Sequence, residues 1–138
     1  QAAEKFGSQC IVAAVDAKKI KDDWVVYSHG GSKNTGINAL KWMKRLQDLG
    51  AGEILLTSMD RDGTKKGFDL ELLNSASCEL TIPIIASGGV GNLDHFRDGV
   101  LVGKANALLA ASVFHFGEFS IKDVKQYLIN TGIDVRIE

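Results

Sequence analysis

Cysteine and proline are scarce in this sequence, whose 138 residues include two cysteines and one proline. Two cysteines cannot form the disulfide framework of a small secreted domain, so we expect Cys10 and Cys78 to be reduced, buried thiols in a cytoplasmic protein. The sequence also contains no linker, no low-complexity tract and no block of like charges. We therefore expect a single domain over residues 1–138.

An excess of charge of one sign is missing as well. Lysine and arginine total 16 residues and aspartate and glutamate 17, which leaves a formal net charge of −1. This balance excludes the basic surface of a general nucleic-acid or membrane-surface binder. No apolar run approaches the roughly 20 residues that a membrane-spanning helix requires. We expect neither nucleic acid nor a membrane as a partner.

Four short apolar runs are present instead, at residues 10–15, 53–59, 82–86 and 107–113. Each run is nearly continuous, which is typical of strands covered on both faces. A segment with helical character follows each run; these segments are residues 35–49, 68–78, 92–103 and 120–131. The last begins with Ser120 and has Asp123 three residues on, a carboxylate form of the capping box. This order predicts an α/β fold with a parallel sheet and right-handed crossovers.

Two segments depart from the repeat. Residues 18–33 form an insert after the first strand, with a polar turn and a β-prone run, so we expect a small hairpin near 18–33. Residues 1–6 have the character of the last turns of a helix that ends at Gly7. Because the chain begins there without a methionine, we expect it to be an excised, engineered or incompletely sequenced piece.

Polar residues follow every predicted parallel strand, where ligands of parallel α/β proteins bind. They are Asp16, residues 60–64, residues 87–89 and Ser112. The glycine-rich turn at 87–91 lets the backbone approach an anion, although a simple tight turn would also explain it. The Ala-Ala-Ser sequence ending at Ser112, on the next predicted strand, favours phosphate binding.

Asp16 ends a strand that is otherwise apolar. It is either a cap partnered by Lys18 or a general acid/base, and the cost of an unpaired carboxylate in an apolar frame favours the second role. Asp62 with Gly63 also matches an ordinary Asp-Gly turn. The three histidines have no metal-ligand spacing and neither cysteine has a positioned base, so we expect no metal, no cofactor and no thiol nucleophile.

Five motifs together resemble the cyclase subunit of imidazole glycerol phosphate synthase, an enzyme of histidine biosynthesis. They are VDAK at 15–18, HGGSKNTG at 29–36, GAGEILLTSMDRDGT at 50–64, IASGG at 85–89 and LAASVFHF at 109–116. The resemblance covers the whole chain, which matches strands five to eight of that family's (β/α)8 barrel. It implies a parallel (βα)4 half of a TIM barrel, since 138 residues are too few for a complete one.

The resemblance also implies an activity. In that family, ammonia from a partner glutaminase subunit reacts with the ribulosyl intermediate of the pathway (PRFAR), which yields imidazole glycerol phosphate and AICAR. Asp16 matches the strand-five member of a pair of catalytic aspartates, whose other member lies on strand one. We expect the half-barrel alone to have little or no activity.

Further roles follow from the same resemblance. The residues that match a phosphate site are Gly63, Ser87, Gly88, Gly89, Ala111 and Ser112. The residues that match the substrate lining are Asn34, Thr35, Thr57, Asp62 and Thr64. Glu53 matches one member of the charged ring where ammonia enters the barrel.

Other interpretations stay open. The sister isomerase of the pathway has related motifs, and a phosphate-binding module or engineered scaffold without catalysis is a third possibility. An open, flavodoxin-like sheet is the alternative to a half-barrel. A half-barrel would expose strand edges and an apolar face, so we expect two copies to associate, closing an eight-stranded barrel.

Overall fold

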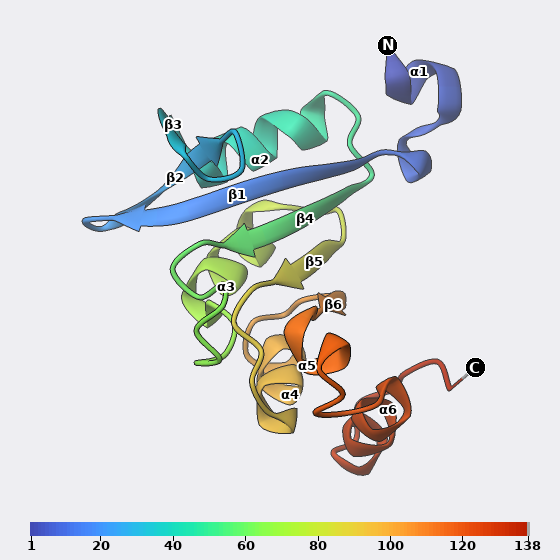
Figure 1. Ribbon diagram of the computed structural model, residues 1–138. Helices are drawn as coiled ribbons and strands as arrows, with labels where there is room; N and C mark the ends of the chain where they lie inside the picture. Colours follow the sequence, from blue (N-terminus) through green and yellow to red (C-terminus); the bar gives the residue numbers. More distant parts are fainter. Residues whose placement is uncertain (138) are drawn as a thin grey trace.

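A mixed sheet organises the molecule (Figure 1). The computed structural model describes residues 1–137, and within them six strands lie in the order β3-β2-β1-β4-β5-β6. The parallel strands are β1 (Val12–Ile20), β4 (Glu53–Ser58), β5 (Ile84–Ser87) and β6 (Ala107–Leu109). The antiparallel strands β2 (Asp23–Ser28) and β3 (Lys33–Asn38) extend the sheet beside the carboxyl half of β1.

Helices connect the parallel strands and pack on the sheet. The longer ones are α2 (Ala39–Asp48), α3 (Leu70–Glu79), α4 (Leu93–Leu101) and α6 (Ile121–Asn130). The short ones are α1 (Ala2–Phe6), the 3-10 turn η1 (Ser8–Cys10) and α5 (Ser112–His115). Helix α2 contacts β1, α3 contacts β5, and α4 contacts both β6 and α6. Among residues 1–137 no helix has the length and apolar character to cross a membrane.

The two faces of the sheet differ in burial. Val15 of β1 and Leu56 of β4 point toward the helices and are each 1% exposed. The alternate residues point to the opposite face, where Val12 is 50% and Leu109 41% exposed. The parallel strands therefore form a half-barrel-like α/β fold with helices on one face, compatible with part of a TIM barrel, and the sheet is not closed. This arrangement confirms the predicted fold class.

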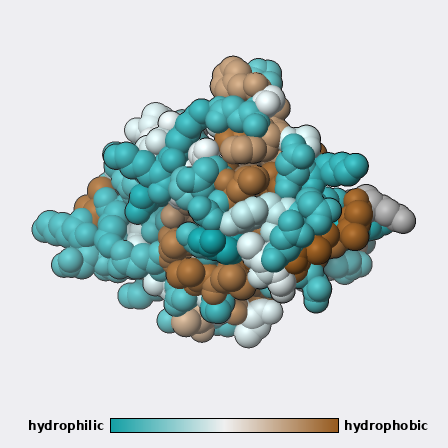
Figure 2. All heavy atoms as spheres, turned by 90° about the horizontal axis from the view of Figure 1, so that it is seen from below, coloured by the Kyte–Doolittle hydropathy of each residue, from teal (hydrophilic) through white to brown (hydrophobic). Residues whose placement is uncertain are grey.

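The edge of the sheet at β6 is apolar. Figure 2 shows apolar side chains on the surface of this side of the molecule. A groove of about 410 Å³ lies there between β6, α4, α6 and residues 133–136. Ile121 lines this groove and is 60% exposed, and Phe116, which lies between α5 and α6 in the chain, is 72% exposed. Within the described residues this apolar surface is exposed to solvent, and exposed apolar surfaces of this kind are typical of interaction sites.

The first helix of the repeat begins later than predicted. We expected it over residues 35–49, but α2 begins at Ala39, where the Asn38 side chain accepts a hydrogen bond from the amide of Lys41. Residues 33–38 instead form β3, because they pair with β2. The predicted strand at 107–113 is also shorter, since it ends at Leu109 and a helical turn follows.

The prediction of two buried thiols is wrong, since Cys10 and Cys78 are both exposed. Cys10 lies in η1, before the strand in which it was expected. Cys78 lies on α3 four residues after the exposed Asn74, and therefore on the side of that helix turned away from the core. The predicted capping box of α6 is confirmed: the amide of Asp123 donates to the Ser120 hydroxyl, and the amide of Ser120 donates to the Asp123 carboxylate.

Candidate functional site

A row of paired, mostly polar residues crosses the sheet at the carboxyl ends of the parallel strands. It lies on the open face, which is the face turned away from the helices, and is called the polar row below. Backbone pairing places Asp16 beside Thr57, Thr57 beside Ser87, and Ser87 beside Leu109. Paired residues point to the same face of a sheet, and neighbouring strands lie about 4.8 Å apart. Asp16 and Ser87 are therefore separated by two strand spacings, roughly 10 Å.

The row continues into the antiparallel strands. Tyr27 pairs with Asp16, and Asn34 pairs with Tyr27. The Lys18 ammonium group lies 5.9 Å from the centroid of the Tyr27 ring. Among the ion pairs of residues 1–137, none joins Lys18 to Asp16, so the interpretation of Asp16 as a cap held by Lys18 is not supported.

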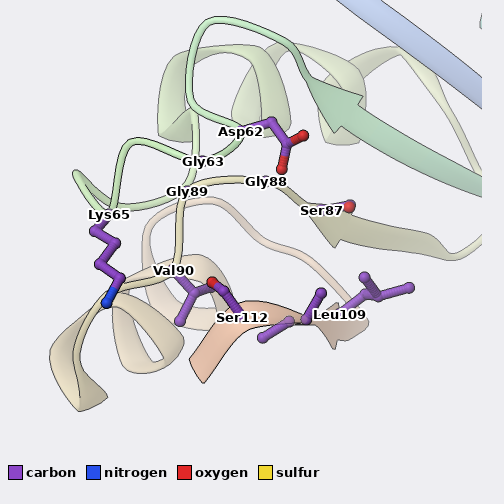
Figure 3. A pocket seen from close by; sticks show the side chains of 11 residues that line it. Asp62, Gly63, Lys65, Ser87, Gly88, Gly89, Val90, Leu109 and Ser112 are labelled. Carbon is purple, nitrogen blue, oxygen red and sulfur yellow. The ribbon is translucent and has the colours of Figure 1, made fainter. Parts of the chain in front are cut away.

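A pocket of about 160 Å³ opens next to this row (Figure 3). Its walls come from the loop after β4, the turn after β5 and the segment after β6. It is lined by Asp62, Gly63, Lys65, Ser87, Gly88, Gly89, Val90, Leu109, Ala110, Ala111 and Ser112. A cavity of about 10–15 Å³ in this measure already holds one water molecule, so the pocket has room for a tetrahedral oxyanion.

Two glycines form the wall after β5 with their backbone. Gly88 and Gly89 have φ angles of 94° and 102°, which side chains with a Cβ rarely adopt. A Cβ at Gly89 would lie 2.2 Å from the carbonyl oxygen of Gly67. The amide of Gly67 in turn donates to the carbonyl of Gly89 at 2.7 Å. Glycine is required at position 89 because two backbones touch there.

The backbone amides of this turn are available to a ligand. Among the hydrogen bonds of the described turns and loops, none has the amide of Gly88, Gly89 or Val90 as its donor. The next amide, that of Gly91, donates to Nδ1 of His95 at 3.0 Å. Consecutive free N–H groups in a glycine-rich turn are complementary to an anion.

Ser58 anchors the loop that forms the opposite wall. Its side chain is buried, and its carbonyl oxygen accepts from the amides of Arg61 and Asp62 at 3.2 and 2.9 Å. Its hydroxyl donates to the Asp69 carboxylate at 3.1 Å. Asp69 also accepts from the amide of Leu72 and so caps α3. The end of β4, the pocket loop and α3 are therefore fixed to one another.

The hairpin supports the same loop from its other side. The amide of Lys19 donates to the Asp60 carboxylate at 2.7 Å, and its ammonium group pairs with Glu71 at 2.6 Å. The hydrogen bond to Glu71 is the main cause of the raised pKa of Lys19. The same ammonium lies 4.8 Å from the centroid of the Trp24 ring. The hairpin thus contacts the pocket loop at its start and α3 at its first turn.

The structure brings the six residues predicted to bind phosphate to this pocket. These are Gly63, Ser87, Gly88, Gly89, Ala111 and Ser112, and Asp62 from the predicted substrate lining joins them. Thr57 lies in the row beside the pocket. Their proximity is an observation of the structure, and their roles in binding stay predictions.

Other predicted residues lie apart from the pocket. The Thr64 hydroxyl donates to the carbonyl of Arg61 at 2.7 Å, within its own loop. Thr35 donates to the carbonyl of Val26 at 2.7 Å in the antiparallel strands. Glu53 begins β4, four residues before Thr57 and on the same face, so it lies roughly 13 Å away at the other end of the strand.

Two residues of this region were missed in the sequence. Tyr27 joins the polar row only because β2 folds back on β1. Lys65 lines the pocket because its loop returns to the turn after β5. A lysine two positions after an Asp-Gly turn that follows a strand is the available sequence signal, and it is a weak one.

The site combines a small pocket suited to an anion with a carboxylate, Asp16, on the same face of the sheet. Within residues 1–137, no three His, Cys, Asp or Glu side chains are grouped to hold a metal ion. A pocket of this size and a carboxylate on the same face of the sheet are suited to anion binding and to proton transfer.

Comparison with known proteins gives the family. The family model described as "Histidine biosynthesis protein" matches residues 1–120. This span includes all the strands described above, the polar row and every residue that lines the pocket. A match over this share of the sequence shows that the chain belongs to the histidine biosynthesis protein family.

Proposed function

We propose that the chain is the C-terminal half-barrel of the cyclase subunit of imidazole glycerol phosphate synthase. In this role it contributes one phosphate site and one acid/base group to the reaction of PRFAR with ammonia. The observation that carries the proposal is the pocket beside Ser87 on the same face of the sheet as Asp16. A phosphorylated substrate held in the pocket would extend across the open face toward this carboxylate.

The pocket's chemistry supports phosphate as the ligand. Gly88 and Gly89 expose their backbone, the amides of residues 88–90 donate no backbone hydrogen bond within residues 1–137, and Ser112 lines the opposite side. A phosphate monoester carries close to two negative charges at pH 7 and accepts several hydrogen bonds. Lys65 supplies a cation at the rim.

Asp16 is the proposed general acid/base. Its strand places it between Tyr27 and Thr57, away from the helices, where a substrate on the open face can reach it. The second aspartate of the proposed mechanism would come from strand one, which this chain does not contain. The chain alone is therefore expected to bind phosphate and to show little or no turnover.

Glu53 is proposed to lie at the ammonia entrance. It stands at the amino end of β4 and on the face shared with Thr57. Ammonia released by a glutaminase subunit would then move along this face of the sheet, past Leu55, toward the polar row. The other members of the charged ring would come from the half with strands one to four.

The decisive experiment combines this chain with a separately produced half carrying strands one to four of a cyclase subunit. Consumption of PRFAR with ammonium as nitrogen donor is followed spectrophotometrically. We expect turnover from the combined halves and a loss of about 100-fold or more with Asp16→Asn, since general acid/base catalysis contributes at least that much. Turnover unchanged by Asp16→Asn would show the acid/base assignment to be wrong.

The same assay separates the alternatives. A half-barrel of the sister isomerase would act on the ribosyl isomer of PRFAR and would not consume PRFAR with ammonium. A phosphate-binding module without catalysis would bind inorganic phosphate but would consume neither PRFAR nor its ribosyl isomer. Asp22→Asn serves as the control, because it makes the same change at an exposed aspartate in the turn between β1 and β2, away from the pocket.

We further propose that a second copy of the chain closes the barrel when the chain is on its own. Strand β2 pairs with β1 only from Asp16 to Ile20, so within the described residues Val12–Val15 and β6 present open edges of similar length. Pairing each free β1 edge with the partner's β6 would join four parallel strands from each copy. Eight parallel strands are the number that a barrel filled by side chains requires.

A further inference from the structure

The charges around the pocket are unevenly placed. Among the lining residues of the described chain, Lys65 is the one cation and Asp62 the one anion. Figure 3 shows the Asp62 carboxylate on the side of Ser87 and Gly88, and the Lys65 side chain at the far rim beside Val90. A phosphate in this pocket would meet a carboxylate on one side, so it needs a compensating positive charge on the other.

The backbone of Lys65 is held firmly at this rim. Its φ angle is 57°, in the left-handed region. A Cβ at Gly91 would lie 2.6 Å from both the Cβ and the carbonyl oxygen of Lys65, so the two backbones are in direct contact. The side chain of Lys65 therefore starts from a fixed point on the glycine-rich turn, and its flexible stem decides where the ammonium goes.

In this structure the ammonium is paired outside the pocket. It donates to the carboxylate of Glu118, which follows α5 on the third wall. The two side chains are 50% and 32% exposed. An ion pair so open to solvent contributes little stability and is easily exchanged for another anion. A phosphate monoester, with nearly twice the charge of a carboxylate, is the stronger competitor.

We propose that Lys65 is the charge partner that gives this pocket its preference for a dianionic phosphate, and that Glu118 restrains it until the anion binds. The inference rests on the phosphate site proposed above. On binding, the ammonium leaves Glu118 and turns to the phosphate, and the ion pair that ties two walls of the pocket opens. Glu118 therefore sets the threshold for binding.

Two neighbouring cations do not share this position. Arg61 and Lys66 belong to the same loop, but they line a separate cavity on its other side, together with His95 and Asp98. Lys66 is therefore a matched control for Lys65, because its replacement removes the same charge from the same loop.

The test measures binding of inorganic phosphate to the chain by calorimetry at low ionic strength and pH 7.5. The variants are Lys65→Met, Glu118→Gln, the double variant and the control Lys66→Met. Lys65→Met is expected to weaken binding about fivefold to tenfold, the range for loss of a partly exposed charged hydrogen bond. Glu118→Gln is expected to tighten it about threefold, since the competing carboxylate is gone. Thermal melts followed by circular dichroism check that each variant is folded.

The double variant isolates the restraint. If Glu118 acts through Lys65, Glu118→Gln has no effect once Lys65 is methionine. An equal gain in both backgrounds, or no gain in either, would overturn the proposed restraint. Equal weakening by Lys65→Met and Lys66→Met would overturn the specific role of Lys65. Binding absent from the unchanged chain and from Glu118→Gln would reject the phosphate site itself, which separates that failure from the others.

Discussion

The indole nitrogen of Trp24 donates a hydrogen bond to the carboxylate of Asp69 at 3.3 Å, and both side chains are buried. The same carboxylate oxygen accepts from the Ser58 hydroxyl, and the second oxygen caps α3. A residue of the hairpin is thus joined to the strand and helix that flank the pocket loop. The contact connects residues 45 positions apart in the sequence.

Replacing Trp24 tests this connection. Trp24→Phe keeps a ring in the core and removes the donor, so we expect a loss of about 1 kcal/mol in the free energy of unfolding. For a domain of this size the melting temperature would fall by roughly 3–5 °C.

Replacing Asp69 removes more. Asp69→Ala removes the cap of α3 and leaves two buried donors unpaired, so we expect a loss of about 3 kcal/mol in the free energy of unfolding. Urea unfolding measures both, with Trp42→Phe as the control.

Replacing Gly89 tests the backbone contact at the pocket. In Gly89→Ala the new methyl group would overlap the carbonyl of Gly67, and the φ of 102° adds strain. We expect a loss of about 3 kcal/mol or more in stability, together with loss of phosphate binding. Gly132→Ala is the control, because its φ is 82° but nothing lies within 4 Å of the added Cβ. That change is expected to cost only about 1 kcal/mol.

The proposed closed dimer is tested through Leu109. This side chain is 41% exposed on the open face of β6, where a partner copy would cover it. We expect the unchanged chain to sediment with the mass of two chains at micromolar concentration, and Leu109→Lys to sediment with the mass of one. Leu101→Lys, on the exposed side of α4, is the control and should leave the mass of two. A stable monomer of the unchanged chain would reject the dimer.

The capping box of α6 predicts a dependence of stability on pH. The hydroxyl of Ser120, and next its amide, lower the pKa of Asp123 from its ordinary value of 3.8. A carboxyl with a lowered pKa in the folded state stabilises the fold above the unfolded value, and this contribution is lost as the pH falls through the folded value. The loss therefore belongs below about pH 4.

The measurement compares variants, because other carboxyls titrate in the same range. Melting temperatures of the unchanged chain and of Asp123→Asn are recorded between pH 2.5 and 7. The difference between them should be constant above pH 5 and should shrink toward pH 2.5. Ser120→Ala should lower the melting temperature at pH 7 and flatten the acid dependence. A difference that stays constant down to pH 2.5 would contradict the assignment.

The parallel fold could be predicted because its signals are local. Continuous apolar runs such as residues 53–59 indicate strands buried by their neighbours, and Ser120 with Asp123 defines a helix start from four residues alone. Strand β3 gave no such signal. Its sequence KNTGIN is mostly polar and includes a glycine, and it becomes a strand because β2 offers it a pairing edge.

The pocket could be predicted in part for the same reason. Gly88, Gly89 and Ser112 each lie just after a strand, and the ends of parallel strands meet at one edge of the sheet. Tyr27 and Lys65 could not be predicted, since each reaches the site through a loop that returns from elsewhere. Exposure of Cys78 depends likewise on which side of α3 faces the sheet.

Local sequence patterns predicted the order of the parallel strands and of the helices that follow them, the parallel sheet and the glycine-rich turn, because periodicity and turn chemistry act over a few residues. Three other features depend on the tertiary structure: the register that aligns Asp16, Thr57 and Ser87, the contact of Gly89 with Gly67, and the pairing of Lys65 with Glu118. These relationships join distant segments, and they form only when the covered face of the sheet is packed against its helices.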